Sequence, residues 1–343
     1  MDWLQHAELE EINRLCAAGE YVHVDGSSVK FELIEALANA SRDFVYPVID
    51  GIYCFLPHLA IARKNQARGR VTDREAVREL AKFYDEFGWK KSAAGDDFCD
   101  AQVFEDLRPV SAKYIRDCHL RVNNYLPSSG KYIADIASGA IQFDEYLTYS
   151  QNFQYRVCVD VSMLALKEAR ARIGDRGIFV LGDIVELPIH SDSVDAIVSL
   201  HTVYHVDHNK QHAAFDELHR VVKPKAPAVI IYTWGNHCTL MNILGLPAAM
   251  TKPFRDALQG RRAHSPAIYF QPHGPSWFEQ KNWGFVVDRY VWRSVSVTFL
   301  KTYVHKWFFG AQILLLVYWL EQQFPALMGL IGQYPLFIVR KSS

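Results

Sequence analysis

The sequence lacks an excess of charge of either sign. It has 343 residues, with 37 lysines and arginines against 38 aspartates and glutamates, so its formal net charge is −1. Nucleic-acid-binding surfaces concentrate basic residues because these neutralise phosphates, whereas here the basic residues are scattered along the chain. The composition therefore predicts no nucleic-acid partner.

Cysteine pairs are also lacking. None of the cysteines forms a C-x-x-C pair or has the spacing of metal ligands; they are Cys16, Cys54, Cys99, Cys118, Cys158 and Cys238. We therefore expect a reduced, cytoplasmic protein with no metal site.

Long hydrophobic runs are lacking too. The first residues, 2–8, are polar and acidic, so no signal peptide is expected. One uncharged run covers residues 307–320, between Lys306 and Glu321, and is too short to cross a bilayer. We expect no integral membrane segment. The run predicts a buried helix; the alternative is an interfacial helix that gives a peripheral membrane contact.

What the chain does have is apolar content: 50% of its residues are hydrophobic. A chain of this length can bury a large core, and we expect one main domain with additions.

The most informative stretch covers residues 132–140, an apolar strand followed by a tight turn. Asp160 follows 21 residues after Gly139, at the end of a second apolar run. In doubly wound α/β sheets, ligands bind at the carboxyl ends of parallel strands, and a carboxylate there accepts hydrogen bonds from ribose hydroxyls. Only Gly139 remains of the three glycines that a pyrophosphate needs, since Ser138 and Ala140 flank it. A nucleoside cofactor without phosphates, such as S-adenosylmethionine, is favoured.

Further apolar runs predict more parallel strands, at residues 178–182 and 196–200. Between the second and third strands, residues 162–173 predict a helix with Ser162 as its N-cap. The order is strand, helix, strand throughout.

Residues 130–235 resemble the class I S-adenosylmethionine-dependent methyltransferases, of the methyltransferase-11/25 kind. The turn at 135–139, Asp160, the Gly182-Asp183 pair, the segments 187–188 and 193–195, and the segment 217–224 occur in family order. Where the family has two glycines after the last segment, this chain has Lys225-Ala226. The resemblance implies an α/β fold with a doubly wound, seven-stranded, Rossmann-like sheet, an N-terminal accessory lobe and helical insertions near the C-terminus.

The resemblance also implies the residues that bind S-adenosylmethionine. Asp135 and Gly139 would face its methionine end, Asp160 its ribose, and Asp183 its adenine amine, although Asp183 could instead cap a helix. Tyr84 belongs to an aromatic cluster at 83–89 that would close over the cofactor, or would simply pack. The implied cofactor-binding residues are Tyr84, Asp135, Ala137, Gly139, Asp160, Val161, Ser162, Gly182, Asp183, Ile184 and Leu200.

The reacting centre is expected just after the fourth strand, at residues 199–208. His201 and His205 could take a proton from an acceptor because histidine titrates near neutrality. Some quinone O-methyltransferases hold a metal here with two glutamates and a histidine; His201 and Tyr204 stand in place of the glutamates, so we expect no metal. The expected catalytic residues are His201, His205 and Tyr204.

Substrate contacts are expected from insertions after the fifth and sixth strands. The polar and aromatic candidates are Trp234, His237, Tyr269, His273 and Arg293, and Arg293 could instead form a salt bridge.

Three segments make up the expected domain organisation. Residues 1–60 form a small lobe that resembles a zinc-ribbon-like accessory domain without its cysteines, with a hairpin at 46–52. Residues 73–128 form a helical lid and lead-in. Residues 129–343 form the methyltransferase domain, with insertions at 236–282 and 292–332. A homodimer is an open alternative.

The expected function is O-methylation of a small polar metabolite, such as a sugar or a sugar-bearing intermediate, by in-line displacement with a histidine base. Two alternatives stay open: N- or C-methylation of a small or lipid-linked acceptor, and a non-catalytic cofactor-binding scaffold subunit.

Overall fold

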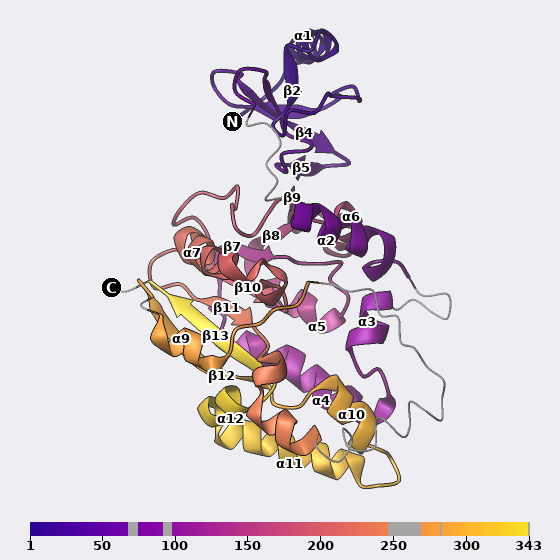
Figure 1. Ribbon diagram of the computed structural model, residues 1–343, viewed down its shortest axis with the longest axis vertical. Helices are drawn as coiled ribbons and strands as arrows, with labels where there is room; N and C mark the ends of the chain where they lie inside the picture. The colour runs from indigo at the N-terminus through magenta and orange to yellow at the C-terminus, as the bar shows by residue number, and fades with distance from the viewer. Residues whose placement is uncertain (68–74, 92–97, 246–268, 282, 342–343) are drawn as a thin grey trace.

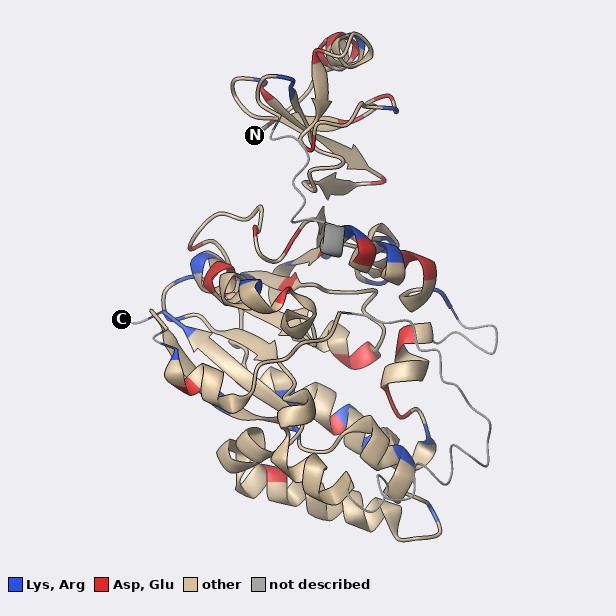
Figure 2. Ribbon diagram, viewed as in Figure 1, with Lys and Arg blue, Asp and Glu red and all other residues tan. Residues whose placement is uncertain are grey.

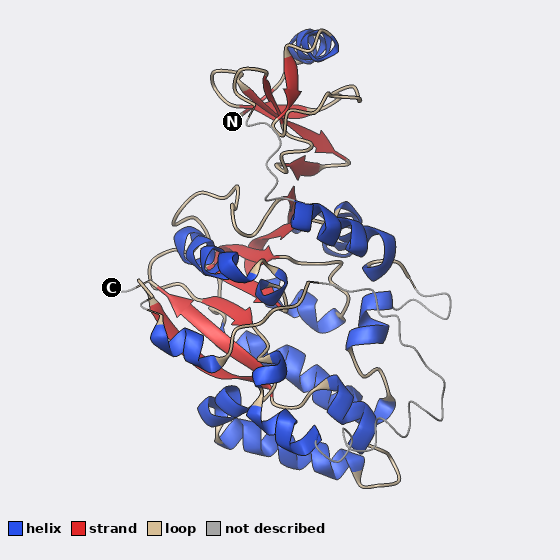
Figure 3. Ribbon diagram, viewed as in Figure 1, coloured by secondary structure: helices blue, strands red, loops and turns tan. Residues whose placement is uncertain are grey.

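The computed structural model describes residues 1–67, 75–91, 98–245, 269–281 and 283–341. An N-terminal lobe lies at one end of the long axis, and the helices α11 (Gly310–Gln323) and α12 (Pro325–Ile331) lie at the other (Figure 1). A sheet with helices on both faces lies between them (Figure 3).

The central sheet has the strand order of the predicted fold. Within the main domain it runs β9 (Gly177–Leu181), β8 (Phe153–Asp160), β7 (Gly130–Ile136), β10 (Ala196–Leu200), β11 (Ala228–Ile231), β13 (Tyr334–Arg340), β12 (Val286–Arg293). The pairs from β9 to β11 are parallel, whereas β13 is antiparallel to both of its neighbours. The prediction of a doubly wound, seven-stranded sheet is confirmed.

Side chains alternate between the two faces of this sheet, and each face has its own core. On one face Ile133 and Cys158 join a cluster that includes residues of α4 (Pro109–Leu120) and α6 (Met163–Ile173). On the other, Ala134 and Val157 join residues of α7 (Gln211–Val221) and α9 (Pro275–Gln280). The strands are buried on both faces, as parallel sheets usually are.

Helix α6 begins where its sequence predicts. The hydroxyl of Ser162 accepts a hydrogen bond from the N–H of Ala165 (3.0 Å) and so caps the helix. The same hydroxyl donates to Asp85, and the N–H of Leu164 donates to that carboxylate as well (3.1 Å). Asp85 lies in the π-helical turn η2 (Tyr84–Gly88) after α2 (Glu75–Phe83), within the segment expected to form a lid. The start of α6 therefore holds this segment in place.

The N-terminal lobe has a core of its own, to which Leu9, Ile12 and Val45 contribute. The predicted hairpin at 46–52 is confirmed: β4 and β5 pair around Asp50 (φ 52°) and Gly51 (φ 70°), the conformation of a type I′ turn. The elements of the lobe are β1 (Asp2–Trp3), α1 (His6–Ala17), β2 (Tyr21–His23), β3 (Ala36–Ala38), β4 (Phe44–Ile49), β5 (Ile52–Cys54) and β6 (Ile61–Arg63).

Strand β5 also joins the lobe to the central sheet. It pairs in parallel with β9, with Ile52 opposite Phe179 and Cys54 opposite Leu181. The sheet therefore continues from the main domain into the lobe, which the sequence did not predict. The domain limits at 60, 73 and 129 stay predictions, and residues 73, 74 and 92–97 lie outside the described part.

The remaining segments are mainly helical. The lead-in holds α3 (Cys99–Phe104) and α4, with α5 (Asp144–Leu147) following β7, and the insertion at 292–332 contributes α10 (Val297–Tyr303), α11 and α12. Of the insertion at 236–282, residues 246–268 and 282 are outside the described ranges.

Across the described residues, no single helix has the length and apolar character to cross a membrane; α11 and α12 meet that measure only as a pair, bent by 111°. The prediction that residues 307–320 form a buried helix is wrong. Helix α11 buries Leu314, but Trp307, Leu315 and Trp319 are exposed.

Candidate active site

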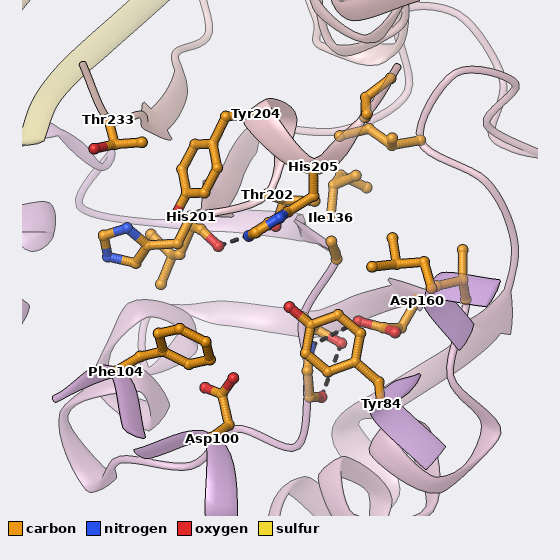
Figure 4. Close-up of a pocket in the computed structure, with 18 of the residues that line it drawn as sticks. Tyr84, Asp100, Phe104, Ile136, Asp160, His201, Thr202, Tyr204, His205 and Thr233 are labelled. Atoms are coloured by element: carbon orange, nitrogen blue, oxygen red, sulfur yellow. Dashed lines mark hydrogen bonds between the residues drawn. The ribbon is translucent and has the colours of Figure 1, made fainter. Parts of the chain in front are cut away.

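A cavity of about 830 Å³ opens at the carboxyl ends of β7, β8 and β10. Figure 4 shows Asp160 and Tyr84 toward one end of it and His201 and Thr233 toward the other, with Asp100 and Phe104 on a third side. Ligand sites of doubly wound sheets lie at this edge. We call the two parts the Asp160 end and the His201 end.

Asp160 is the central group of the Asp160 end. Its Oδ2 accepts from the N–H of Gly139 (2.8 Å) and its Oδ1 accepts from the N–H of Ser162 (2.9 Å). Burial raises the pKa of Asp160 to about 6, although these two hydrogen bonds oppose the shift. Each oxygen keeps a lone pair for a hydroxyl donor in the cavity.

The turn after β7 brings its backbone close to the cavity. Ala137 (φ 57°) and Gly139 (φ 56°) both have left-handed backbone conformations, and both line the cavity. The ring of Trp89 packs on Gly139 and stacks with Tyr84, their centroids 5.4 Å apart. The indole N–H of Trp89 is buried and has no hydrogen-bond partner among the described residues.

Asp135, below this turn, lines the cavity but is held by the protein. The guanidinium of Arg156 pairs with its carboxylate, and both side chains are buried. Its expected contact with the methionine end of a cofactor must therefore compete with this ion pair.

The residues expected on the adenine side, Val161, Gly182, Asp183, Ile184 and Leu200, all line the cavity, at or just after the ends of β8, β9 and β10. Oδ1 of Asp183 accepts a hydrogen bond from the N–H of Val185 (3.1 Å), so this oxygen stabilises the turn that follows β9. The prediction for Ser162 needs correction: its hydroxyl caps α6 and bonds Asp85, and it does not line the cavity.

The Asp160 end fits S-adenosylmethionine. The buried carboxylate of Asp160, whose oxygens keep lone pairs, suits the ribose hydroxyls, and Asp183 and Ile184 suit the adenine. A Cβ at position 139 would fill part of this cradle.

His201 is the most distinctive residue of the His201 end. It follows β10 with φ 59°, an uncommon conformation for a non-glycine residue, fixed by its N–H donating to the carbonyl of Ile231 (3.1 Å). Its ring contacts Trp292 edge-on (4.5 Å). Burial, reinforced by Arg293, lowers the pKa of His201 to about 3, so the imidazole is neutral at pH 7.

His205 and Tyr204 also line the cavity, from the short helix after β10. Nδ1 of His205 lies 2.8 Å from the carbonyl oxygen of Tyr269, which places the proton on Nδ1 and leaves Nε2 as an acceptor. Burial lowers the pKa of His205 to about 4. The structure thus brings together His201, Tyr204 and His205.

Arg293 reaches the cavity as half of a buried ion pair. Its Nη1 donates to Oε1 of Glu105 (2.6 Å). Burial alone would raise the pKa of Glu105, but Arg293 and His119 lower it to about 2. The salt bridge expected as the alternative for Arg293 is present, and Arg293 also lines the cavity, but its contact with a substrate stays a prediction.

Four expected substrate residues do not line the cavity. Trp234 is wholly buried and donates from Nε1 to the carbonyl of Gly329 (2.9 Å), and His237 is exposed beside Gly274. His273 stacks on Trp277 (4.0 Å). Tyr269 has only an indirect effect on the cavity: its carbonyl oxygen pairs with Nδ1 of His205 and so orients the ring of His205. The chain turns away from the cavity after Thr233, which takes the lining position instead.

Several lining residues were missed. Asp100, whose pKa burial raises to about 6, accepts a hydrogen bond from Gln142 (3.1 Å). It comes from α3, far from the sheet in sequence, so no local pattern marks it. Other unpredicted lining residues are Phe104, Glu105, Thr202, Phe270, Lys301, Gln333 and Tyr334.

No group of three or more histidine, cysteine, aspartate or glutamate side chains suited to a metal occurs within the ranges that the structure covers. All six cysteines are free thiols.

The sheet order and this cavity define a class I S-adenosylmethionine-dependent methyltransferase domain, whose cofactor is S-adenosylmethionine. Residues 134–230 match the family model described as a methyltransferase domain. A search of curated proteins finds no match.

Solved structures similar to this chain include three methyltransferase structures. A SAM-dependent methyltransferase from Archaeoglobus fulgidus is 15% identical, with TM-score 0.42, over 67% of this chain and 95% of that one. The complex of the Haloferax volcanii Trm112 methyltransferase activator with a methyltransferase is 14% identical, with TM-score 0.41, over 79% of this chain and 97% of that one. The N-methyltransferase NodS of Bradyrhizobium japonicum, in complex with S-adenosyl-l-homocysteine, is 16% identical, with TM-score 0.34, over 46% of this chain and 72% of that one.

Proposed function

We propose that the protein transfers a methyl group to a hydroxyl oxygen of a small polar acceptor, such as a sugar or a sugar-bearing intermediate, with His201 as the base. The observation that carries this proposal is the state of His201. Its ring lines the cavity, and burial lowers its pKa to about 3, so the imidazole is neutral at pH 7. A neutral imidazole can accept the proton of a hydroxyl.

The polar residues around His201 support a hydrogen-bonding acceptor. Asp100, Thr202 and Lys301 line the same cavity as His201 and can bond several hydroxyls. Buried polar groups favour ligands that pair with them and reject ligands that leave them unpaired. Phe104 and Tyr334 supply flat apolar walls on which a sugar ring can rest.

The protein's own part in the reaction is mostly alignment. When bound, S-adenosylmethionine supplies the methyl group, which moves by in-line displacement. Asp160 and Asp183 orient the cofactor, Trp89 and Tyr84 exclude water from it, and His201 orients the acceptor hydroxyl and holds its proton. Alignment of this kind supplies much of the rate enhancement in bimolecular transfers.

The experiment combines binding and turnover. Calorimetry with S-adenosylmethionine comes first, because a protein that does not bind this cofactor cannot be an O-, N- or C-methyltransferase that uses it. Transfer of a labelled methyl group to a panel of sugars, amines and quinols then identifies the acceptor atom. Labelled O-methyl products support the proposal, labelled amines or carbons favour the N- or C-methyl alternative, and binding without turnover on any acceptor favours a scaffold subunit.

A matched pair of variants tests the base. His201→Asn should keep cofactor affinity and lose turnover, whereas His212→Asn, an exposed histidine outside the cavity, should keep both. Undiminished turnover in His201→Asn would exclude His201 as the base. The cytoplasmic location and the homodimer stay predictions.

A further inference from the structure

Helices α11 and α12 and the loop before them expose large apolar side chains at one end of the molecule. Three consecutive aromatic residues form the tip of the loop: Trp307 is 83% exposed, Phe308 68% and Phe309 74%. We call this the α11–α12 surface, and its large apolar members are Trp307, Phe308, Phe309, Leu315, Leu316, Trp319, Phe324 and Leu327.

The exposed residues of α11 form a continuous stripe. Leu315 and Trp319 are four residues apart, so they lie one above the other on the same side of the helix, and Leu316 lies beside them. The opposite side buries Leu314 against the core. Helix α11 is thus apolar on its inner and its outer side, which differs from an ordinary surface helix.

The one charged residue of α11 points inward. Glu321 is buried and accepts from Nη2 of Arg121 (2.8 Å), from the hydroxyl of Tyr114 (2.7 Å), and from the N–H and hydroxyl of Ser294 (2.7 Å each). This network fixes α11 rigidly to α4 and the end of β12. It also leaves the outer side without a charge.

The segment that contains this surface carries few charges. Between Arg293 and Arg340 the only charged residues are Lys301, Lys306 and Glu321. Lys301 and Lys306 are both exposed, and Lys306 directly precedes Trp307. Figure 2 shows the layer of α11 and α12 almost entirely without charged residues.

We propose that the α11–α12 surface docks on the interface of a phospholipid bilayer, with residues 307–309 inserted among the headgroups and α11 lying along the plane. Tryptophan and phenylalanine partition favourably into this zone, and lysines at its rim attract anionic lipids. The bend of 111° between α11 and α12 suits a surface position, since the pair cannot form a straight span.

A second copy of the chain fits this surface less well. Interfaces between proteins carry about one hydrogen bond per 100–200 Å², and the exposed side of α11 offers few groups for that purpose, namely Gln312, Gln322, Gln323 and the indole N–H of Trp319. A lipid interface needs no such partners.

The docked surface lies close to the catalytic cavity in the chain. Val297, Thr298 and Lys301 of α10 line the cavity, and the aromatic loop follows α10 directly. Docking therefore brings α10, whose residues line part of the cavity, near the membrane, where an acceptor with a lipid tail could be presented.

The test uses the full chain and vesicles of phosphatidylcholine alone or with 30% phosphatidylglycerol. Co-flotation should occur with both, more strongly with the anionic vesicles. The triple variant Trp307→Ser, Phe308→Ser, Phe309→Ser should lose at least about a hundredfold in partitioning, since each aromatic side chain contributes hydrophobic free energy on burial. Ile34→Ser, an equally exposed apolar site at the opposite end, should bind like the unchanged protein.

Tryptophan quenching by brominated lipids gives an independent readout. Quenching should occur on docking and fall in Trp307→Phe, which keeps the apolar surface but removes the fluorophore. Absence of flotation, or a triple variant that floats unchanged, overturns the proposal. A stable dimer that the triple substitution dissociates, with no vesicle binding, assigns the surface to a second copy instead. Calorimetry with S-adenosylmethionine reports on the methyltransferase function separately.

Discussion

The ring of Trp89 covers the Cα of Gly139: a Cβ built on Gly139 would lie 2.5 Å from Cη2 of Trp89. Real side chains do not approach so closely, so the lid can reach the cofactor turn only because position 139 is glycine. The close approach couples the lid to the turn.

Gly139→Ala should therefore displace Trp89 and weaken S-adenosylmethionine binding by at least about tenfold. Part of the cost is the left-handed backbone, about 1–2 kcal/mol for an L-residue. Gly19→Ala is the control, because Gly19 also has positive φ (73°) but nothing lies within 4 Å of its Cβ. Calorimetry measures both. Equal losses in the two variants would show that the backbone, and not the contact with Trp89, sets the effect.

Asp160 makes cofactor binding pH-dependent. Burial raises its pKa to about 6 in the ligand-free protein, and the ionised carboxylate is the better acceptor for ribose hydroxyls. Affinity should therefore fall about tenfold for each pH unit below 6. Calorimetry at pH 5 and pH 7.5 checks this. Asp160→Asn should bind more weakly at both values, with a smaller difference between them.

The same shift affects stability in the opposite direction. The pKa of Asp160 is higher in the folded than in the unfolded chain, so its contribution to stability is fully present below about pH 4 and is lost as the pH rises through 6. Between pH 4 and pH 7 the ligand-free protein should lose about 2–3 kcal/mol from this group. In Asp160→Asn, urea unfolding should show a smaller loss over that interval; an identical loss would contradict the shift.

His201 should remain neutral throughout the working pH range, because its pKa is lowered to about 3. With saturating cofactor, titration of His201 should therefore cause no step in the pH–rate profile near pH 6.5. The His201→Asn variant should accordingly remove no such step. The variant itself should lower kcat about a hundredfold, the usual size of a general-base contribution. If His201→Asn does remove a step near pH 6.5, His201 titrates near neutrality when the cofactor is bound, which would contradict the prediction.

Glu105→Gln should destabilise the fold. It leaves Arg293 charged and buried without its partner, a loss of about 3–5 kcal/mol in comparable buried pairs. Glu217→Gln removes one partner of the partly exposed pair with Arg220 and should cost about 1 kcal/mol or less. Thermal unfolding distinguishes them, and equal costs would mean that burial of the Arg293 pair has no energetic effect.

The sequence predicted the sheet and the Asp160 end well because their signals are local. Apolar runs mark the strands, Ser162 marks the start of α6, and Asp160 stands at the carboxyl end of an apolar strand. The His201 end was predicted only in part. His201 and His205 follow a strand directly, but Asp100 and Glu105 reach the cavity from a distant helix, and Trp234 faces the core although its neighbour Thr233 faces the cavity.

Exposure was the hardest property to predict. Residues 307–320 have the composition of a core helix, and nothing in that composition says which side meets solvent. The decisive residue is Glu321, which looks like the polar end of a buried run but is drawn inward by Arg121. The hydrogen-bond network of a single carboxylate thus determines which side of the helix faces outward.

The pairing of β5 with β9 has a consequence for how the protein can be divided. If the chain were cut after residue 67, the remaining domain would present β9 as a bare sheet edge, its backbone N–H and C=O groups open to pairing with another molecule. That edge leads directly into Gly182 and Asp183, so the lobe protects from aggregation the strand that precedes two of the residues expected to contact the cofactor.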